Sequence, residues 1–533
     1  MKSIVLILLI ITCIAAQQRV DPVVSTPKGQ IRGLPAQDGD YDMFLGIPYA
    51  LVDENDPFGP AIPHPGFDTT FEATTGGVMC LQASYDGIDG TLQCLQLDVH
   101  VPTTASATNR LPVIFHIHGG GFVTGDKGIL GPKFLMKHDV IIVNMNYRLN
   151  VYGFMCTSEN RFKNQGLKDQ VLAMEWVKEN IEAFGGDLNS ITVLGLSAGA
   201  MSIDLHLLAI ENFAHKAIIM SGPALSIWTL APENNDIPID IAKELGYNTT
   251  NAKDALEFLA GIDPVEVVTV ADRIGIMRSA SRHPLTTPCV EPVSDDAFLT
   301  DYPINMQPKV KGMDIMIGHT NKEAMFIYPK SDDVSYYEKY EFSMELATDF
   351  TEVLDVDTVR HFYIGDDKIN EKVREEILDY ASDLAFVYPT IRSTDKYLAA
   401  GARNVYNYMF SYEGDRNIMR MVMNHTTPGA CHGDDIAYLF EVPEFVDVEP
   451  TEDDQELIDV MTKMWTDFIK EGNPTPNPEQ FPFSWSPVTD SQRRPYLSID
   501  RPISMENRVF SDRMAFWELY YQLHGDKING IKN

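Results

Sequence analysis

Ser197 stands in a short glycine-containing segment whose residue types could hold a nucleophile. Residues 191–194 (Ile-Thr-Val-Leu) are mostly apolar and partly β-branched, so they predict a short buried strand. Gly195-Leu196-Ser197-Ala198-Gly199 comes next, followed by a stretch typical of a helix. A strand that passes through Gly-x-Ser-x-Gly into a helix exposes the serine hydroxyl on a strained turn. The alternative is a serine in an ordinary glycine-rich connection, because the bare pattern also arises by chance.

A serine hydroxyl attacks an acyl carbon only when a base takes its proton and donors hold the resulting oxyanion. A glycine run, His118-Gly119-Gly120-Gly121-Phe122, follows an apolar stretch at residues 111–117. Consecutive glycines after a strand expose backbone N–H groups with no side chain in the way. We therefore expect the N–H groups of Gly120, Gly121 and Ala198 to form an oxyanion hole; a flexible turn is the alternative.

The elements that must position these residues alternate along the chain. Nearly continuous apolar runs predict strands at residues 111–117, 140–143, 191–194, 217–220, 315–317 and 405–410. Residues 167–184 have helical periodicity, with Ala173, Trp176, Val177, Ile181 and Phe184 on one face. A second amphipathic helix is expected at residues 456–470. This order predicts an α/β fold with a mostly parallel central sheet and helices on both faces.

Two further regions, residues 236–280 and 332–383, have the character of helical insertions. We expect them to form a cap over the site. No segment resembles a linker, so residues 17–533 are expected to form one domain.

The N-terminus predicts export from the cell. Residues 1–16 carry one lysine, an apolar stretch and then small residues, which is the pattern of a secretory signal peptide. A buried N-terminal strand is the alternative. No later window is long and apolar enough to cross a bilayer. We therefore expect a secreted, extracellular protein with no membrane span.

Charge, cysteine content and sequons narrow the class of protein. The formal net charge is −34, which disfavours binding to nucleic acid and to anionic membranes. Asn248-Thr-Thr and Asn424-His-Thr are glycosylation sequons, which fit export. An odd number of cysteines outside the signal peptide implies a free thiol or an intermolecular bond. These cysteines are Cys80, Cys94, Cys156, Cys289 and Cys431.

Over nearly its whole mature length, the chain resembles the type-B carboxylesterase and cholinesterase family. The matching stretches are FLGIPYA, HGGGF, NYRLNVYGF, QGLKDQ, WVKENIEAFGGD, GLSAGA, MSGPAL and GACHGDD. The resemblance implies an α/β-hydrolase fold and a Ser-Glu-His triad in that chain order. It implies a small-molecule ester as substrate and no metal or other cofactor.

The family pattern assigns one residue to each catalytic role. Ser197 is the nucleophile. Glu323 is the acid, in Gly318-His-Thr-Asn-Lys-Glu323-Ala324, and His432 is the base, in Gly429-Ala-Cys-His432. His432 would take the Ser197 proton and return it to the leaving alcohol, while Glu323 would fix the imidazole tautomer. A core histidine and a solvated loop carboxylate are the alternatives.

The resemblance implies further structural roles. Cys80 and Cys94 match a disulfide of the family, and Arg148 and Asp169 match a buried ion pair. Trp228 matches a position near the acyl pocket, although a plain core tryptophan is an equal alternative.

Several positions depart from the family pattern. Leu196 occupies a site that is Glu in most members and Gln in juvenile hormone esterases. Leu92-Gln93 and residues 55–61 lack both partners of a structural ion pair. The thirteen residues between Cys80 and Cys94 include no Trp, which counts against choline esters because a quaternary ammonium needs an aromatic face.

The sequence therefore predicts a secreted serine carboxylesterase acting on neutral, apolar esters, such as odorant or pheromone acetates or xenobiotic esters. The segment VDENDPFGP resembles insect secreted esterases, including moth antennal enzymes. One alternative is a catalytically inactive, cholinesterase-like adhesion or binding protein. Such proteins typically lose a triad residue and carry a membrane span, and neither feature is found in the sequence. The other alternative is a juvenile hormone esterase, against which Leu196 counts.

Overall fold

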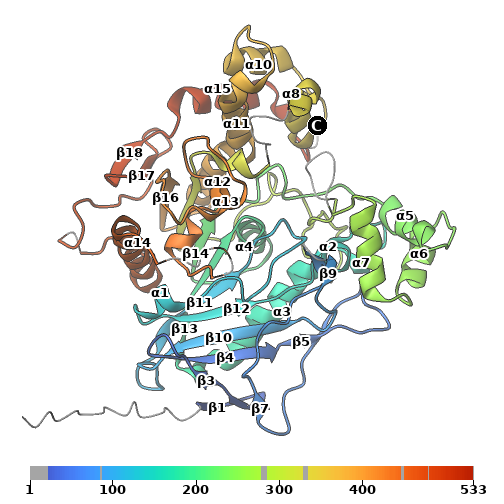
Figure 1. Cartoon of the computed structure of the whole chain (residues 1–533), viewed down its shortest axis with the longest axis vertical. Helices are drawn as coiled ribbons and strands as arrows, with labels where there is room; N and C mark the ends of the chain where they lie inside the picture. Colours follow the sequence, from blue (N-terminus) through green and yellow to red (C-terminus); the bar gives the residue numbers. More distant parts are fainter. Residues whose placement is uncertain are drawn as a thin grey trace, which may run out of the picture.

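The computed structural model describes residues 22–531, except 85–86, 278–284, 328–333, 444, 446–448 and 478. The expected signal peptide, residues 1–16, lies outside the described residues. An 11-stranded sheet forms the centre of the molecule (Figure 1). Its strands are, in spatial order, β18 (Ser504–Asn507), β17 (Pro495–Ile499), β16 (Asn404–Phe410), β15 (Asp314–Thr320), β14 (Lys216–Met220), β13 (Gly186–Leu196), β11 (Leu111–Ile117), β12 (Ile141–Met145), β10 (Gln96–Pro102), β4 (Tyr41–Pro48) and β3 (Leu34–Pro35).

The middle of this sheet is parallel. All pairings from β12 through β11 and β13 to β17 are parallel, and antiparallel pairings occur only at the two edges. Each of the six apolar runs predicted as strands overlaps one of β11 to β16. The prediction of a mostly parallel sheet is therefore confirmed.

Helices bury both faces of the sheet, which explains why its strands are apolar throughout. On β11, Val113 and Phe115 pack in one cluster with α3 (Gln165–Asn180) and α4 (Ala198–Ala209). Ile114, between them, packs in another cluster with α1 (Lys133–Met136) and α14 (Glu452–Glu471). Successive strand side chains point to opposite faces, so both sets must be hydrophobic.

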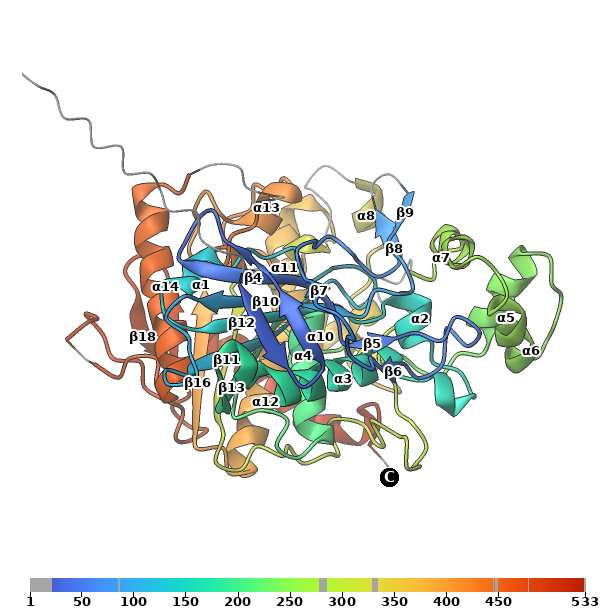
Figure 2. The ribbon, with the colours of Figure 1, turned by 90° about the horizontal axis from the view of Figure 1, so that it is seen from below.

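Both regions that the sequence predicts to be helical insertions contain helices. Residues 236–277 form α5 (Asp236–Glu244), α6 (Ala252–Leu259) and α7 (Pro264–Arg273). Their apolar faces pack with Tyr152 and Met155, on the side of the molecule opposite α14 (Figure 1, Figure 2). The later helices are α8 (Val334–Lys339), α9 (Ser343–Asp349), α10 (Val356–Ile364), α11 (Arg374–Ser382), α12 (Tyr388–Ala399) and α15 (Ser511–Leu523). Among the described residues, no helix has the length and hydrophobicity that crossing a membrane requires.

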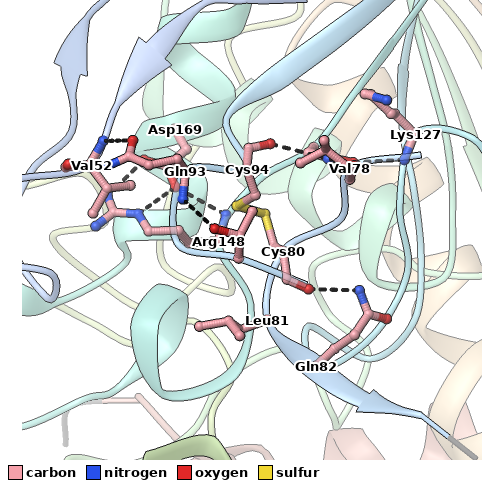
Figure 3. Close-up of a disulfide and its surroundings, with 12 residues drawn as sticks. Val52, Val78, Cys80, Leu81, Gln82, Gln93, Cys94, Lys127, Arg148 and Asp169 are labelled. Atoms are coloured by element: carbon pink, nitrogen blue, oxygen red, sulfur yellow. Dashed lines mark hydrogen bonds and ion pairs between the residues drawn. A yellow bond between two sulfur atoms is a disulfide. The ribbon is translucent and has the colours of Figure 1, made fainter. Parts of the chain in front are cut away.

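Two disulfides fasten the loops outside the sheet. Cys80 and Cys94 are joined, with their Cα atoms 4.9 Å apart (Figure 3), and Cys156 is joined to Cys289. Cys431 is a free, buried thiol. Its burial raises its pKa, so it stays protonated and is a poor nucleophile.

A buried ion pair lies beside the first disulfide (Figure 3). Arg148 is bidentate on Asp169, with Nε 2.8 Å and Nη2 2.7 Å from the two carboxylate oxygens. Near it, the Gln93 amide donates to the Val52 carbonyl oxygen over 2.7 Å and accepts from the Val52 N–H over 3.2 Å. A neutral amide thus fastens this loop, where the sequence lacks the ion pair expected of the family.

Candidate active site

Ser197 lies on a sharp turn at the carboxyl end of the central strand β13. Its φ of 58° and ψ of −127° are unfavourable for a residue with a side chain, and α4 begins at the next residue. A Cβ added at Gly199 would lie 2.1 Å from the Ile117 carbonyl oxygen, and one added at Gly195 would lie 2.6 Å from the Gly199 carbonyl carbon. Both glycines are therefore required for the strand and helix to pass this closely.

Glu323 follows β15 at the start of a short 3-10 turn, η3 (Glu323–Phe326), and is fully buried. Its Oε2 lies 2.6 Å from Nδ1 of His432. Its Oε1 accepts from the Ser221 hydroxyl over 2.6 Å and from the Thr320 N–H over 2.7 Å. Burial alone would raise the pKa of Glu323, but the charge and hydrogen bonds of its partners lower it below its ordinary value.

The loop that carries His432 is tied to the loop that carries Glu323. The Ala430 N–H donates to Oδ1 of Asn321 over 2.8 Å, and the Lys322 N–H donates to the Ala430 carbonyl oxygen over 3.1 Å. These bonds fix two segments that are distant in the sequence, so that the imidazole and carboxylate meet. The other ring nitrogen of His432, Nε2, is buried and makes no hydrogen bond to the described residues, which leaves it available to a hydroxyl.

Ser197 and His432 line the same cavity, whose volume is about 530 Å³, within the usual range of ligand sites. None of the described lining residues is Asp, Glu, Lys or Arg. Two lining histidines are held neutral, because burial lowers the pKa of His116 to about 3 and lowers that of His118 as well. The cavity is therefore suited to an uncharged, apolar molecule.

The glycine run after β11 also lines this cavity. Gly120 and Gly121 have φ of 107° and 61°, and their N–H groups make no hydrogen bond to the described residues. A Cβ at Gly120 would lie 2.0 Å from the Thr124 carbonyl oxygen, so this turn requires glycine. Ala198 also lines the cavity, and as the first residue of α4 its N–H has no partner within the helix. Three amide donors thus border the cavity beside Ser197.

Aromatic side chains pack against His432. Phe326 stacks on the imidazole with ring centroids 4.5 Å apart, and the Phe386 centroid lies 4.9 Å from it. Trp228 lines the cavity and meets Phe386 edge to face at 5.3 Å. Among the described residues of the two regions expected to form a cap, none lines the cavity; Phe386, just after the second region, does.

Sequence reasoning missed Ser221, which the structure places on the carboxylate of Glu323. The available signal was its position directly after the predicted strand at residues 217–220, at the edge where the other site residues gather. Nothing in the sequence indicated that Phe326 and Phe386 pack against His432. Asn248 and Asn424, the two sequon asparagines, are exposed.

Comparisons with known proteins show the family of this chain. The model of the carboxylesterase family matches residues 20–517. This chain belongs to the carboxylesterase family. Like its relatives, this esterase is a carboxylic ester hydrolase with an α/β-hydrolase fold.

Two relatives and one solved structure are similar to this chain over most of its length. It is 30% identical to Esterase E4 of Myzus persicae, covering 85% of this chain and 86% of the relative. It is 29% identical to a juvenile hormone esterase of Tribolium castaneum, covering 93% of each chain. The crystal structure of the juvenile hormone esterase of Manduca sexta, with OTFP covalently attached, superposes with a TM-score of 0.82 at 27% identity. That match covers 94% of this chain and 100% of the other.

Proposed function

We propose that the esterase hydrolyses neutral, apolar carboxylic esters through an acyl-enzyme on Ser197, with His432 as base and Glu323 as acid. The observation that carries this proposal is the hydrogen bond between Glu323 and His432 at the edge of an uncharged cavity that Ser197 also lines. Glu323 orients the imidazole with Nδ1 toward the carboxylate, which leaves Nε2 to accept a proton.

The proposed reaction has two steps, acylation and deacylation of Ser197. The Ser197 hydroxyl oxygen bonds to the ester carbonyl carbon while Nε2 of His432 takes its proton. The carbonyl oxygen, now negative, accepts hydrogen bonds from the N–H groups of Gly120, Gly121 and Ala198. The carbon–oxygen bond to the alcohol then breaks, and His432 returns the proton to the leaving alcohol. In the second step, the oxygen of a water molecule bonds to the acyl carbon while Nε2 of His432 takes its proton. The bond between the acyl carbon and the Ser197 oxygen then breaks, His432 returns the proton to that oxygen, and the carboxylic acid leaves.

The cavity lining supports a neutral substrate of the kind found among odorant or pheromone acetates and xenobiotic esters. Charged esters would have to leave water without a partner for their charge, which is costly. We assign Trp228 to the acyl pocket, because it borders the aromatic group beside His432. Juvenile hormone belongs in the assay panel, since two relatives are juvenile hormone esterases.

We propose that the esterase is secreted. Two disulfides and two exposed sequon asparagines, Asn248 and Asn424, support this localisation, because disulfides persist mainly in oxidising compartments. Peptide-N-glycosidase treatment of the protein from culture medium should increase its gel mobility, and replacing both asparagines with glutamine should abolish that change.

The test of the activity is hydrolysis of p-nitrophenyl acetate by the purified secreted protein, with Ser197→Ala as the matched variant. We expect turnover by the wild type and a loss of at least about 10³-fold in kcat for the variant. Equal rates for the two proteins, with equal folded fractions by circular dichroism, would contradict the role of Ser197.

A further inference from the structure

A second hollow, which we call the outer cleft, has a volume of about 490 Å³ and shares none of its described lining residues with the catalytic cavity. The helix α13 (Ile418–Val422) contributes to both hollows. Ile418 and Met419 line the catalytic cavity, whereas Arg420 and Met421 line the outer cleft. Most of the outer cleft is polar, and its remaining lining residues are Glu413, Gly414, Asp415, Asn417, Asn424 and His425.

The first turn of α13 is fastened to the loop of the catalytic histidine. The N–H groups of Met419 and Arg420 donate to Oδ1 of Asp434 over 2.9 and 3.2 Å. Asp434 is fully buried and lies two residues after His432. The position of this turn is therefore fixed relative to the imidazole.

The outer end of α13 lacks such an anchor. Among the described residues, the backbone donors of residues 421 and 423–425 bond only to carbonyl oxygens of residues 417–421, within the same helix and turn. Met421 and Val422 are 45% and 54% exposed. A helix end with only local hydrogen bonds opens readily unless something covers it.

Asn424 lines the outer cleft beside this exposed end. Asn424-His425-Thr426 is a sequon, and the exposed side chains of Asn424 and Thr426 make no hydrogen bond to the described residues. The amide nitrogen of Asn424 is therefore free to bond to the anomeric carbon of N-acetylglucosamine. In that step the amide nitrogen loses a proton, and the bond from the anomeric carbon to a lipid-linked pyrophosphate breaks, with the pyrophosphate as the leaving group.

We propose that the outer cleft holds the first sugars of an N-linked glycan on Asn424, which cover the outer end of α13. This inference rests on the proposed secretion of the esterase. Covalent attachment gives the sugars an effective concentration in the millimolar range, so weak contacts suffice. Asp415, which has no partner among the described residues, can accept hydrogen bonds from sugar hydroxyls, and Arg420 can donate to them. Met421 offers an adaptable apolar surface to the face of a sugar ring.

Enzymatic release distinguishes a seated glycan from one that extends into solvent. Peptide-N-glycosidase converts each released site to aspartate, which peptide mapping by mass spectrometry detects. In folded protein from culture medium, we expect release from Asn424 to be at least about tenfold slower than from Asn248, because the cleft must open first. Asn248 is exposed and lines neither hollow. The difference should disappear after denaturation. Equal rates in the folded protein, or a difference that persists after denaturation, would overturn the proposal.

Hydrogen exchange tests whether the glycan covers α13. Thr426→Ala abolishes the sequon and keeps Asn424, whose φ of 50° disfavours replacement by glutamine. We expect amide exchange at residues 421–425 to be at least about fivefold faster in this variant than in the wild type. Thr426→Ser, which retains the sequon, should match the wild type. Asn248→Gln, which removes the other glycan, should not change exchange at these residues.

The remaining outcomes separate this inference from the proposed function. An unmodified Asn424 in the secreted protein, or equal exchange in folded Thr426→Ala and Thr426→Ser, would overturn the inference. Hydrolysis of p-nitrophenyl acetate by the same protein would show that the esterase activity stands. Wild-type protein retained in the cell without a glycan would overturn both this inference and the proposed secretion. If Thr426→Ala does not fold, the release rates of the wild type decide.

Discussion

Removing the Ser221 hydroxyl tests whether catalysis and stability depend on every hydrogen bond that the buried Glu323 carboxylate accepts. Glu323 is fully buried and is hydrogen-bonded to Ser221, Thr320 and His432. Ser221→Ala deletes one of these donors and leaves the positive φ of 52° in place, so backbone strain does not change. Ser226→Ala is the matched control, because Ser226 is a buried serine nearby whose hydroxyl has no partner among the described residues.

The expected cost of Ser221→Ala follows from the charge of the acceptor. A hydrogen bond to an ionised group contributes about 1.5–3 kcal/mol. If half or more of this free energy supports the orientation and charge of the His432 imidazole, kcat/KM for p-nitrophenyl acetate falls by at least about threefold and up to about 100-fold. Ser226→Ala should remain within about twofold of the wild type.

The variant should also change how stability depends on pH. The pKa of Glu323 is lowered in the folded protein from its ordinary value of 4.5, so its ionised form stabilises the fold above that pH. This stabilisation disappears as the pH falls through the folded pKa. Ser221→Ala moves the folded pKa back upward, so the difference in free energy of unfolding between the two proteins should be full at pH 7 and narrower below about pH 4.

Denaturant titrations at several pH values, together with initial rates, measure both effects. A Ser221→Ala protein that matches Ser226→Ala in rate, or whose stability deficit is the same at every pH, would refute the reasoning.

Three further predictions concern the scaffold. Arg148→Met should lower the free energy of unfolding by about 3–5 kcal/mol, because it leaves the fully buried Asp169 carboxylate unpaired; urea titration measures this, and a loss below 1 kcal/mol would contradict it. Replacing Cys156 and Cys289 with serine should lower the free energy of unfolding by up to about 5 kcal/mol, since their bond spans 133 residues; an unchanged melting temperature would contradict this. Gly199→Ala should yield little soluble esterase, because its Cβ would collide with the Ile117 carbonyl oxygen of β11; normal yield and activity would contradict the requirement for glycine at this turn.

Much of the fold could be predicted because both faces of the central sheet are buried. The resulting apolar runs are visible in the sequence, as at residues 111–117 and 405–410, and each lies in a strand. The Gly-x-Ser-x-Gly turn and the glycine run predicted that Ser197 and the oxyanion-hole residues gather at the carboxyl ends of these strands. Glu323 and His432 came only from the family resemblance, since nothing in their local sequence indicates that they meet.

Other features depend on contacts between distant segments. Three cysteines were left after Cys80 and Cys94, and the sequence did not indicate which two would pair; the structure joins Cys156 to Cys289. Residues 236–280 were predicted to be helical, but helical character does not show what an apolar face packs against. That face packs with Tyr152 and Met155 and does not line the cavity.

Covalent labelling of the intact esterase tests the central claim most directly. A fluorophosphonate reacts with a serine only when a base and an oxyanion hole activate it. After brief exposure, intact mass spectrometry should show one adduct per chain, and peptide mapping should place it on Ser197. Ser197→Ala should show no adduct, and His432→Ala should react far more slowly. Folded wild-type protein that stays unlabelled, or an adduct on another residue, would contradict the account.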